Sequence, residues 1–362
     1  MCGVMWMKDL GHGANTEIMA IKYNKNPKDI LDFSSNINPK LIPNLESYIL
    51  EGLKECTSYP DINYTRLRKN ISDYIKLKPE FIIPGNGATE IIYLLMKSIN
   101  KRLAIFNPTF SEYKRSAELN GLDILHLNLD KNNNFEINLE NLKSNINNFD
   151  SLFVCNPNNP NGKVKNLEKV LDLIVENNKL LIVDETFMEF VENEEKYSLI
   201  KYVEKYENIF ILKAVTKFFG MPGLRLGYGV TSNKEIIDKI YTYKEPWTIN
   251  SFADNLSNYI FKDENYIKES KEYYIKERDF LTKELSQIPS IEFYETDTNF
   301  ILLKLKENKA NDIKEKLFIE SNILIRDASN FIGLDESYIR IAIKSHSENE
   351  ILIKELKKVL GY

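Results

Sequence analysis

A lysine and an arginine in the stretch LKAVTKFFGMPGLRLGYG could combine a reactive amine with a phosphate-binding group. Lys217 follows the apolar run NIFIL, and Arg225 lies eight residues farther along the chain. An amine at the end of a buried strand can form a Schiff base with a carbonyl compound, and a nearby guanidinium can bind a phosphate. Lysine also ends many strands because its charge aids solubility, so this pair alone leaves both interpretations open.

Three further stretches carry groups that would complete such a site. Asp184 ends the apolar run LLIVD, where a carboxylate could keep a pyridinium nitrogen protonated, as the electron sink of pyridoxal phosphate (PLP) requires. Asn159 lies in the turn NPNNPNG, where its amide could bond a ring hydroxyl. In PGNGATE, the backbone N–H groups of Gly87, Ala88 and Thr89 could cradle a phosphate at the start of a helix. Each stretch also reads as an ordinary cap or turn.

The elements that must position these groups alternate from about residue 80 to 230. Short apolar runs predict strands, and longer amphipathic segments between them predict helices. This pattern favours a largely parallel sheet covered on both faces, with the active site beyond the carboxyl ends of its strands. The predicted strands are EFIIPG, RLAIF, SLFVC, KLLIVDE, NIFIL and RLGYGV, and the predicted helices are ATEIIYLLMKSI, SEYKRSAELN and LEKVLDLIVENN.

After YKEPWTIN the pattern changes to a smaller α+β domain. A long charged helix is predicted over about 263–287, followed by the strands NFILLKL, ILIRD and YIRIAI. The first forty residues have no clear period and are interpreted as an arm and loop. We therefore predict an N-terminal arm over 1–45 that contributes to the active site, a large cofactor-binding domain over 46–245 and a small domain over 246–362.

Composition argues against several classes of protein. The net charge of −5 is not that of a nucleic-acid binder, and no apolar run approaches the ~18 residues of a membrane span. Cys2, Cys56 and Cys155 have neither disulfide nor zinc spacing, so they are expected to be structural and no metal is expected. The opening MCGVMWMKDL does not read as a signal peptide. We expect a cytoplasmic protein with no nucleic-acid or membrane partner.

The order of the phosphate cradle, amide, carboxylate and lysine resembles that of the fold-type-I PLP enzymes, the aspartate aminotransferase superfamily, from about residue 10 to the end. The resemblance implies PLP as the cofactor, with Lys217 as the Schiff-base lysine and Asp184 as the partner of the ring nitrogen. It further implies cofactor-binding roles for Gly87, Ala88, Thr89, Phe110, Asn159, Thr216 and Arg225. Phe110, in NPTF, would stack on the ring, although it also reads as a core aromatic.

The segment SYPDINYTRLR is similar to the one that lends a tyrosine to the neighbouring subunit's cofactor phosphate. This implies that Tyr59 serves the partner's site and that the protein is a homodimer with shared active sites. Two positions depart from the family pattern: Ala214 stands where a serine often contacts the phosphate, and Phe187 stands where many aminotransferases have a tyrosine that donates to the ring hydroxyl.

Within the superfamily the chain resembles the histidinol-phosphate aminotransferase subgroup and, more narrowly, the decarboxylases of O-phospho-L-threonine in cobalamin biosynthesis. The stretches that carry this likeness are GHGAN, with Ala14 in place of a glycine, LDFSSNINP, DETFMEF, TKFFGMPGLRLGY, ILIRDASNFIGL and YIRIAIKSHSEN. Phe187 agrees with the decarboxylase pattern. The likeness implies that Arg340 binds the substrate carboxylate and that the substrate-binding residues also include His12, Gly13, Asn36, Asn159 and Arg326.

The expected reaction is therefore decarboxylation of a small phosphorylated amino acid, O-phospho-L-threonine, to (R)-1-aminopropan-2-yl phosphate. O-Phospho-L-serine lacks only a methyl group, so we expect it to react as well, because one such group gives only about 1–3 kcal/mol of discrimination. Two alternatives stay open: a histidinol-phosphate aminotransferase that uses 2-oxoglutarate, and a PLP-fold protein that only binds. The second alternative is disfavoured because the chain keeps all four cofactor groups: Lys217, Asp184, Asn159 and Arg225. The two substrate arginines, Arg326 and Arg340, also read as surface ion-pair partners.

Overall fold

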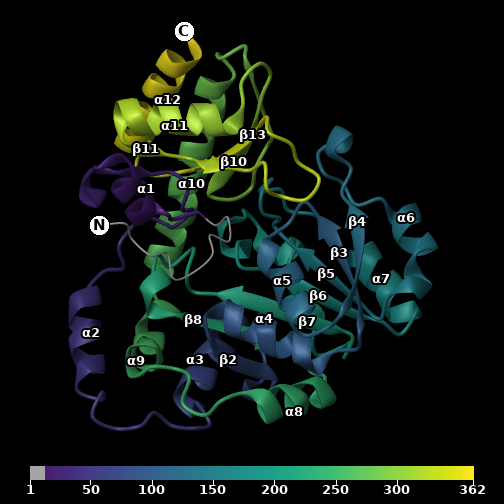
Figure 1. Cartoon of the computed structure of the whole chain (residues 1–362). Helices are drawn as coiled ribbons and strands as arrows, with labels where there is room; N and C mark the ends of the chain where they lie inside the picture. Colours follow the sequence, from purple (N-terminus) through teal and green to yellow (C-terminus); the bar gives the residue numbers. More distant parts are fainter. Residues whose placement is uncertain (1–12) are drawn as a thin grey trace.

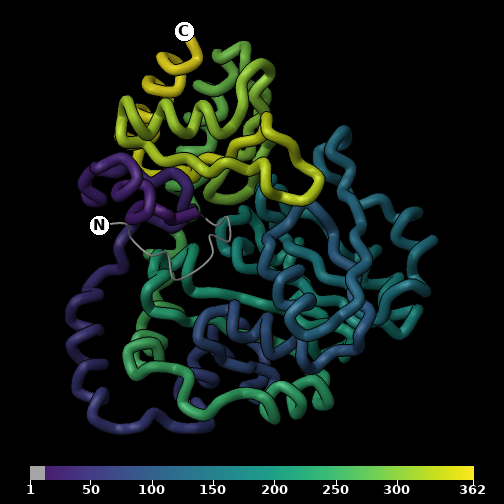
Figure 2. The backbone as a smooth tube through the Cα atoms, viewed as in Figure 1, coloured from purple at the N-terminus to yellow at the C-terminus, as the bar shows by residue number. Residues whose placement is uncertain are grey.

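The computed structural model describes residues 13–362, which form a layer around a large sheet and a smaller layer above it (Figure 1). The path of the backbone shows that both ends of the described chain lie in the smaller layer (Figure 2). None of the helices in this described part of the chain is long and apolar enough to cross a membrane.

The large sheet has seven strands in the order β2-β8-β7-β6-β5-β3-β4. β8 runs opposite to the other six strands, which are parallel to one another, and this confirms the predicted mostly parallel sheet. The strands are β2 (Ile82–Asn86), β3 (Arg102–Asn107), β4 (Asp123–Asn128), β5 (Ser151–Cys155), β6 (Leu180–Asp184), β7 (Ile209–Ala214) and β8 (Leu226–Val230).

Helices cover both faces of this sheet because its central strands are apolar on both sides. Phe153 and Ile182 pack in one buried cluster with residues of α4, α5 and α8. The alternate residues Leu181 and Val183 pack in another cluster with α7. The helices of this layer are α2 (Leu45–Leu53), α3 (Thr65–Ile75), α4 (Gly87–Ser98), α5 (Ser111–Leu119), α6 (Leu139–Ser144), α7 (Glu168–Glu176), α8 (Lys234–Tyr243) and α9 (Ser251–Ile260).

The smaller layer contains an antiparallel sheet in the order β12-β13-β10-β9. The predicted long charged helix is α10 (Glu264–Leu285). The run ILIRD forms two short strands instead of the one predicted strand. The first, β11 (Ile323–Leu324), pairs with β1, and the second, β12 (Arg326–Asp327), pairs with β13 (Tyr338–Ala342). Its elements are α10 (Glu264–Leu285), β9 (Ile291–Phe293), β10 (Phe300–Leu305), α11 (Ala310–Ser321), β11 (Ile323–Leu324), β12 (Arg326–Asp327), β13 (Tyr338–Ala342) and α12 (His346–Leu360). The predicted fold class, a large α/β part plus a smaller α+β part, is confirmed.

The segment interpreted as an arm and loop has more regular structure than predicted. α1 (Thr16–Tyr23) packs Met19 against Phe318 and Leu324 of the smaller layer, and β1 (Leu31–Asp32) pairs parallel with β11. Both elements are short and are stabilised by tertiary contacts, so they leave little periodicity in the sequence. Short 3-10 turns complete the chain: η1 (Pro27–Asp29), η2 (Pro79–Phe81), η3 (Lys131–Asn133), η4 (Ile146–Asn148), η5 (Met188–Phe190), η6 (Glu194–Lys196), η7 (Leu199–Tyr202) and η8 (Pro222–Leu224).

Candidate active site

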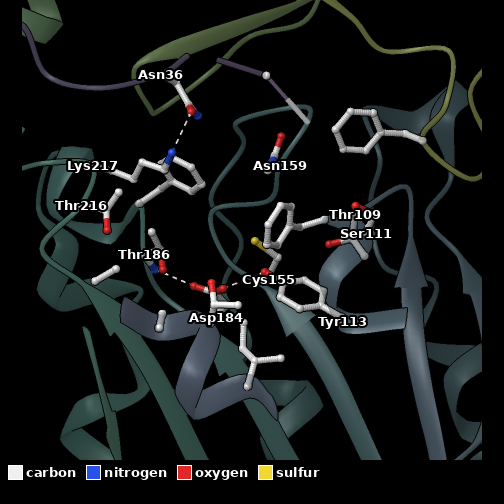
Figure 3. A pocket seen from close by; sticks show the side chains of 18 of the residues that line it. Asn36, Thr109, Ser111, Tyr113, Cys155, Asn159, Asp184, Thr186, Thr216 and Lys217 are labelled. Carbon is white, nitrogen blue, oxygen red and sulfur yellow. Dashed lines mark hydrogen bonds between the residues drawn. The ribbon is translucent and has the colours of Figure 1, made fainter. Parts of the chain in front are cut away.

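A cavity of about 410 Å³ lies at the carboxyl ends of the parallel strands, facing the smaller layer (Figure 3). The last residues of β3, β5, β6 and β7 all line it: Asn107, Cys155, Asp184 and Ala214. This is the location that an open parallel sheet predicts for a ligand. Twelve of the fifteen predicted site residues line the cavity: Gly13, Asn36, Ala88, Thr89, Phe110, Asn159, Asp184, Thr216, Lys217, Arg225, Arg326 and Arg340.

Asp184 lies deep in the cavity at the end of β6 and is 5% exposed. One carboxylate oxygen accepts the backbone N–H of Thr186 at 2.9 Å, and the other accepts the Tyr113 hydroxyl at 2.7 Å. Burial raises the pKa of Asp184, while these two donors act in the opposite direction. A cationic ring nitrogen facing this carboxylate would relieve the cost of its burial.

Lys217 lies in the turn after β7, with its amine directed at Asn36 (Figure 3). Nζ donates a hydrogen bond to Asn36 Oδ1 at 3.3 Å. Burial, together with the positive charges of Arg340, Lys344 and Arg225, lowers the pKa of Lys217 to about 8. A large fraction of this amine is therefore neutral near pH 8, which is the form that attacks a carbonyl carbon.

The junction of β2 and α4 differs from the predicted cradle of three N–H groups. The Gly87 N–H donates to the Arg225 carbonyl at 3.0 Å, so the cradle is left with the N–H groups of Ala88 and Thr89. Gly87 has a φ of 77°, and a Cβ there would lie 2.5 Å from a guanidinium nitrogen of Arg225. Only glycine combines this backbone conformation with such a close approach. Thr216 and the Arg225 side chain also line this corner, opposite the first turn of α4.

Arg340, on β13, is buried beside the cavity with no carboxylate in ion-pair contact among residues 13–362. It donates to Asn159 Oδ1 at 2.5 Å and to the Ser34 carbonyl at 2.9 Å. Its buried Nε has no hydrogen-bond partner in the described part of the chain. Burial and the charge of Arg326 lower the pKa of Arg340. A buried guanidinium that is not paired with a carboxylate is suited to bind an anionic ligand.

Arg326 lies directly opposite Arg340 in the pairing of β12 with β13. Like charges at directly opposed positions repel, and an anion between them offsets that repulsion. Arg326 donates to the Asp327 carbonyl and to Asn330 Oδ1, the latter at 2.6 Å, and its guanidinium lies over the Phe331 ring. The two strands thus bring both predicted substrate arginines to one wall of the cavity.

Asn36 and Gly13 line the cavity from the N-terminal part of the described chain. Asn36 is buried, and its Nδ2 donor has no hydrogen-bond partner among residues 13–362. A Cβ at Gly13 would lie 2.4 Å from the Ser34 carbonyl oxygen, so the close approach that glycine allows here is to the protein's own backbone. Ala14 has a φ of 66°, a conformation that favours glycine, so this replacement of the family's glycine carries a conformational cost. His12 lies outside the described residues.

Tyr59 does not approach the cavity of its own chain. Its ring is 79% exposed and lies 4.7 Å from that of Trp247, measured between centroids. Its predicted contribution to a partner subunit stays a prediction.

Phe110 and Phe187 both line the cavity. Phe110 precedes Asp184 in the sequence and Phe187 follows it, and neither side chain carries a hydroxyl. Phe187 packs edge-on against Phe300 with 5.1 Å between centroids. Cys155, expected to be only structural, also lines the cavity, but burial raises the pKa of its thiol to about 12. The Cys155 thiol is therefore neutral and a poor nucleophile.

Sequence reasoning missed four cavity residues that hydrogen-bond to predicted site residues: Tyr113, Thr186, Ser34 and Asn330. Tyr113 could have been found from helical spacing, since it lies one turn into the helix that begins after Phe110. The other three act through loop contacts that no local pattern shows.

The cavity residues fit a bound PLP. A buried carboxylate, a lysine of lowered pKa and the first turn of α4 surround one space, and a glycine backbone keeps the phosphate corner open. Asn36 Nδ2 and Arg340 Nε, which have no hydrogen-bond partner among the described residues, belong to two further residues of the cavity lining.

Comparison with known proteins relates the chain to a family of enzymes. Residues 28–356 match the family model "Aminotransferase class I and II". A provisionally named threonine-phosphate decarboxylase of Caldanaerobacter subterraneus subsp. tengcongensis is 40% identical over 279 residues, which cover 75% of each chain.

Two solved structures share the whole architecture. The histidinol-phosphate aminotransferase from Clostridium acetobutylicum has a TM-score of 0.87 and 40% identity, covering 92% of this chain and 99% of that one. The L-threonine-O-3-phosphate decarboxylase from Porphyromonas gingivalis has a TM-score of 0.81 and 25% identity, covering 91% of this chain and 99% of that one. The similarity thus extends to proteins named for both reactions that the sequence leaves open.

Proposed function

The chain belongs to the class I and II aminotransferase family, and on that premise we propose that it decarboxylates O-phospho-L-threonine to (R)-1-aminopropan-2-yl phosphate with PLP as cofactor. The observation that carries this proposal is the pairing of Arg326 with Arg340 on one wall of the cavity. Two guanidinium groups side by side suit a small substrate that carries two anionic groups, a carboxylate and a phosphate. We propose O-phospho-L-serine as a second substrate.

The cofactor supplies an electron sink, because its ring accepts the electron pair that is released when a bond to Cα breaks. Asp184 would hold a proton on the ring nitrogen. Asn159 would donate its amide N–H to the ring hydroxyl, since its oxygen already accepts from Arg340. The first turn of α4, with Thr216 and Arg225, would bind the cofactor phosphate.

On the substrate side, Arg340 would bind the α-carboxylate and fix which bond to Cα is aligned for breaking. Arg326 and Asn36, with His12 and the Gly13 backbone, would bind the substrate phosphate. Lys217 would bind the cofactor covalently between turnovers. Once the substrate amine has displaced it, Lys217 would give a proton to Cα after CO₂ leaves, a role that its lowered pKa suits.

We further propose that the protein is a cytoplasmic homodimer of shared active sites, with Tyr59 reaching the partner's cofactor phosphate, and that it acts in cobalamin biosynthesis. The exposure of Tyr59 beside Trp247 supports the dimer, since a large exposed aromatic pair is suited to contact another chain. The pathway rests on the sequence resemblance.

The proposed reaction is tested by incubating the PLP-loaded protein with O-phospho-L-threonine in the absence of any keto acid. We expect CO₂ together with the aminopropanol phosphate. The same protein is then offered histidinol phosphate and 2-oxoglutarate. Amino transfer in that mixture, with no CO₂ from phosphothreonine, would replace our proposal by the alternative reaction.

The histidinol-phosphate aminotransferase reaction is a second candidate because the solved aminotransferase of that name shares 40% identity with this chain. Phe187 argues against it, since this position offers no hydroxyl to the cofactor ring. The two reactions also differ in their need for a keto acid, which the assay above controls.

A further inference from the structure

Tyr113 connects two groups to which the proposed function gives roles, although no sequence motif singles out Tyr113. Its side chain is 1% exposed, and its hydroxyl donates to Asp184 Oδ2 at 2.7 Å (Figure 3). Its ring stacks on Phe153 with 4.0 Å between centroids and meets Phe110 edge-on at 5.6 Å. Tyr113 therefore contacts both the residue proposed to face the ring nitrogen and the residue proposed to stack on the ring.

The Tyr113 hydroxyl and Thr186 are the donors that favour the ionised form of Asp184. Thr186 acts through its side chain and its backbone N–H, and both contacts stay in place when Tyr113 is substituted. Burial disfavours ionisation of Asp184, whereas a hydrogen bond to the carboxylate favours it. Burial also holds the pKa of Tyr113 well above its usual value, so the phenol stays protonated and remains a donor.

Other titratable groups around Asp184 do not replace this hydrogen bond. The Cys155 thiol on β5 is neutral, and the negative charge of Glu189 on η5 opposes ionisation of Asp184. The Lys217 amine favours ionisation through its charge, but its hydrogen bond goes to Asn36 and not to the Asp184 carboxylate. Among the described residues that line the cavity, Tyr113 is the one tyrosine.

We propose that Tyr113 is a positioning residue that keeps Asp184 ionised, so that the proton between Asp184 and the cofactor ring stays on the ring nitrogen. This inference rests on the proposed binding of PLP and deepens it.

The test is Tyr113→Phe, which keeps the ring contacts with Phe110 and Phe153 and removes only the hydroxyl. A positive ring nitrogen eases proton loss from the bond between Lys217 and the cofactor. We therefore expect the midpoint of the pH titration of the bound cofactor's absorbance to rise by about one pH unit. We also expect kcat to fall about tenfold, with KM for O-phospho-L-threonine unchanged.

Reconstitution with 1-deaza-PLP, which lacks the ring nitrogen, separates this effect from packing. With that analogue, wild type and Tyr113→Phe should titrate alike. Equal midpoints with PLP itself would overturn the proposal, and so would a difference that persists with the analogue. In a second variant, 3-fluorotyrosine at position 113 is a stronger donor of nearly the same shape and should lower the midpoint, and an unchanged or raised midpoint would also count against the proposal.

Tyr93→Phe is the matched control, because the Tyr93 hydroxyl donates to Glu112 and lies outside the cavity lining. It should leave the titration midpoint where it is in wild type. CO₂ release is measured on the wild-type protein. CO₂ release from the wild-type protein therefore tests the proposed reaction. The titration midpoint of Tyr113→Phe tests this inference separately.

Discussion

At the scale of single residues, the cavity concentrates positive charge in a buried place. Burial, together with the positive charges of Arg340, Lys344 and Arg225, lowers the pKa of Lys217 from the ordinary 10.5 to about 8. An enzyme that needs a neutral amine near neutral pH gains from such an arrangement. The same cluster also attracts the anionic groups of cofactor and substrate.

The rate at which the protein free of cofactor takes up PLP should therefore depend on pH around 8. Protonated lysine cannot attack, so the rate should rise as pH increases and level off above about pH 8. Arg340→Met should move this midpoint upward, because the charge of Arg340 is one cause of the lowered pKa. Stopped-flow absorbance gives the rates. A wild-type rate that still climbs with pH above about pH 9.5 would show an ordinary lysine.

Arg340→Lys tests the role of the guanidinium fork with the charge kept. A lysine cannot reach Asn159, the Ser34 carbonyl and a substrate carboxylate at the same time. We expect kcat/KM for O-phospho-L-threonine to fall about hundredfold, with the affinity for PLP changed much less. Steady-state kinetics and PLP fluorescence titration provide the two numbers. Equal losses in both would place Arg340 in cofactor binding instead.

At the scale of elements, the phosphate corner depends on how closely β8 approaches the first turn of α4. A Cβ at Gly227 would lie 2.2 Å from the Ala88 backbone nitrogen, so an alanine there must push the helix start away from the strand. The N–H groups of this turn are the ones proposed to bind the cofactor phosphate.

Gly227→Ala should therefore weaken PLP binding by about tenfold or more, as followed by fluorescence titration. Gly223→Ala is the matched control, since a Cβ at Gly223 meets nothing within 4 Å. If both variants bound PLP as tightly as wild type, the first turn of α4 would not be the phosphate site.

The elements also show why part of the structure could be predicted from sequence. The central strands are continuous apolar runs because both of their faces are covered, and such runs predicted the sheet and the position of Asp184. The pairing of Arg326 with Arg340 depends on the register in which β12 meets β13 across the loop 328–337, and no local pattern encodes that register. The positive φ of Ala14 and the occupied N–H of Gly87 are likewise tertiary features.

At the scale of the whole molecule, the proposed dimer predicts complementation between inactive variants. Lys217→Ala and Tyr59→Ala damage groups that we assign to the same active site but to different chains. A mixed dimer should therefore hold one intact site, built from Lys217 of one chain and Tyr59 of the other, and mixing should restore activity. Mixing Lys217→Ala with Arg225→Ala is the control, because both groups come from one chain and no intact site forms. Activity that does not return in the first mixture would contradict shared sites.

We propose that this cavity directs PLP chemistry to loss of the carboxylate. The measurement that tests this most directly is the number of CO₂ molecules released per subunit from O-phospho-L-threonine labelled with ¹³C at the carboxyl carbon, with no keto acid present. A decarboxylase regenerates its cofactor in every cycle, so we predict continued release through many turnovers. No labelled CO₂, or conversion of the cofactor to its amino form after a single half-reaction, would contradict the account.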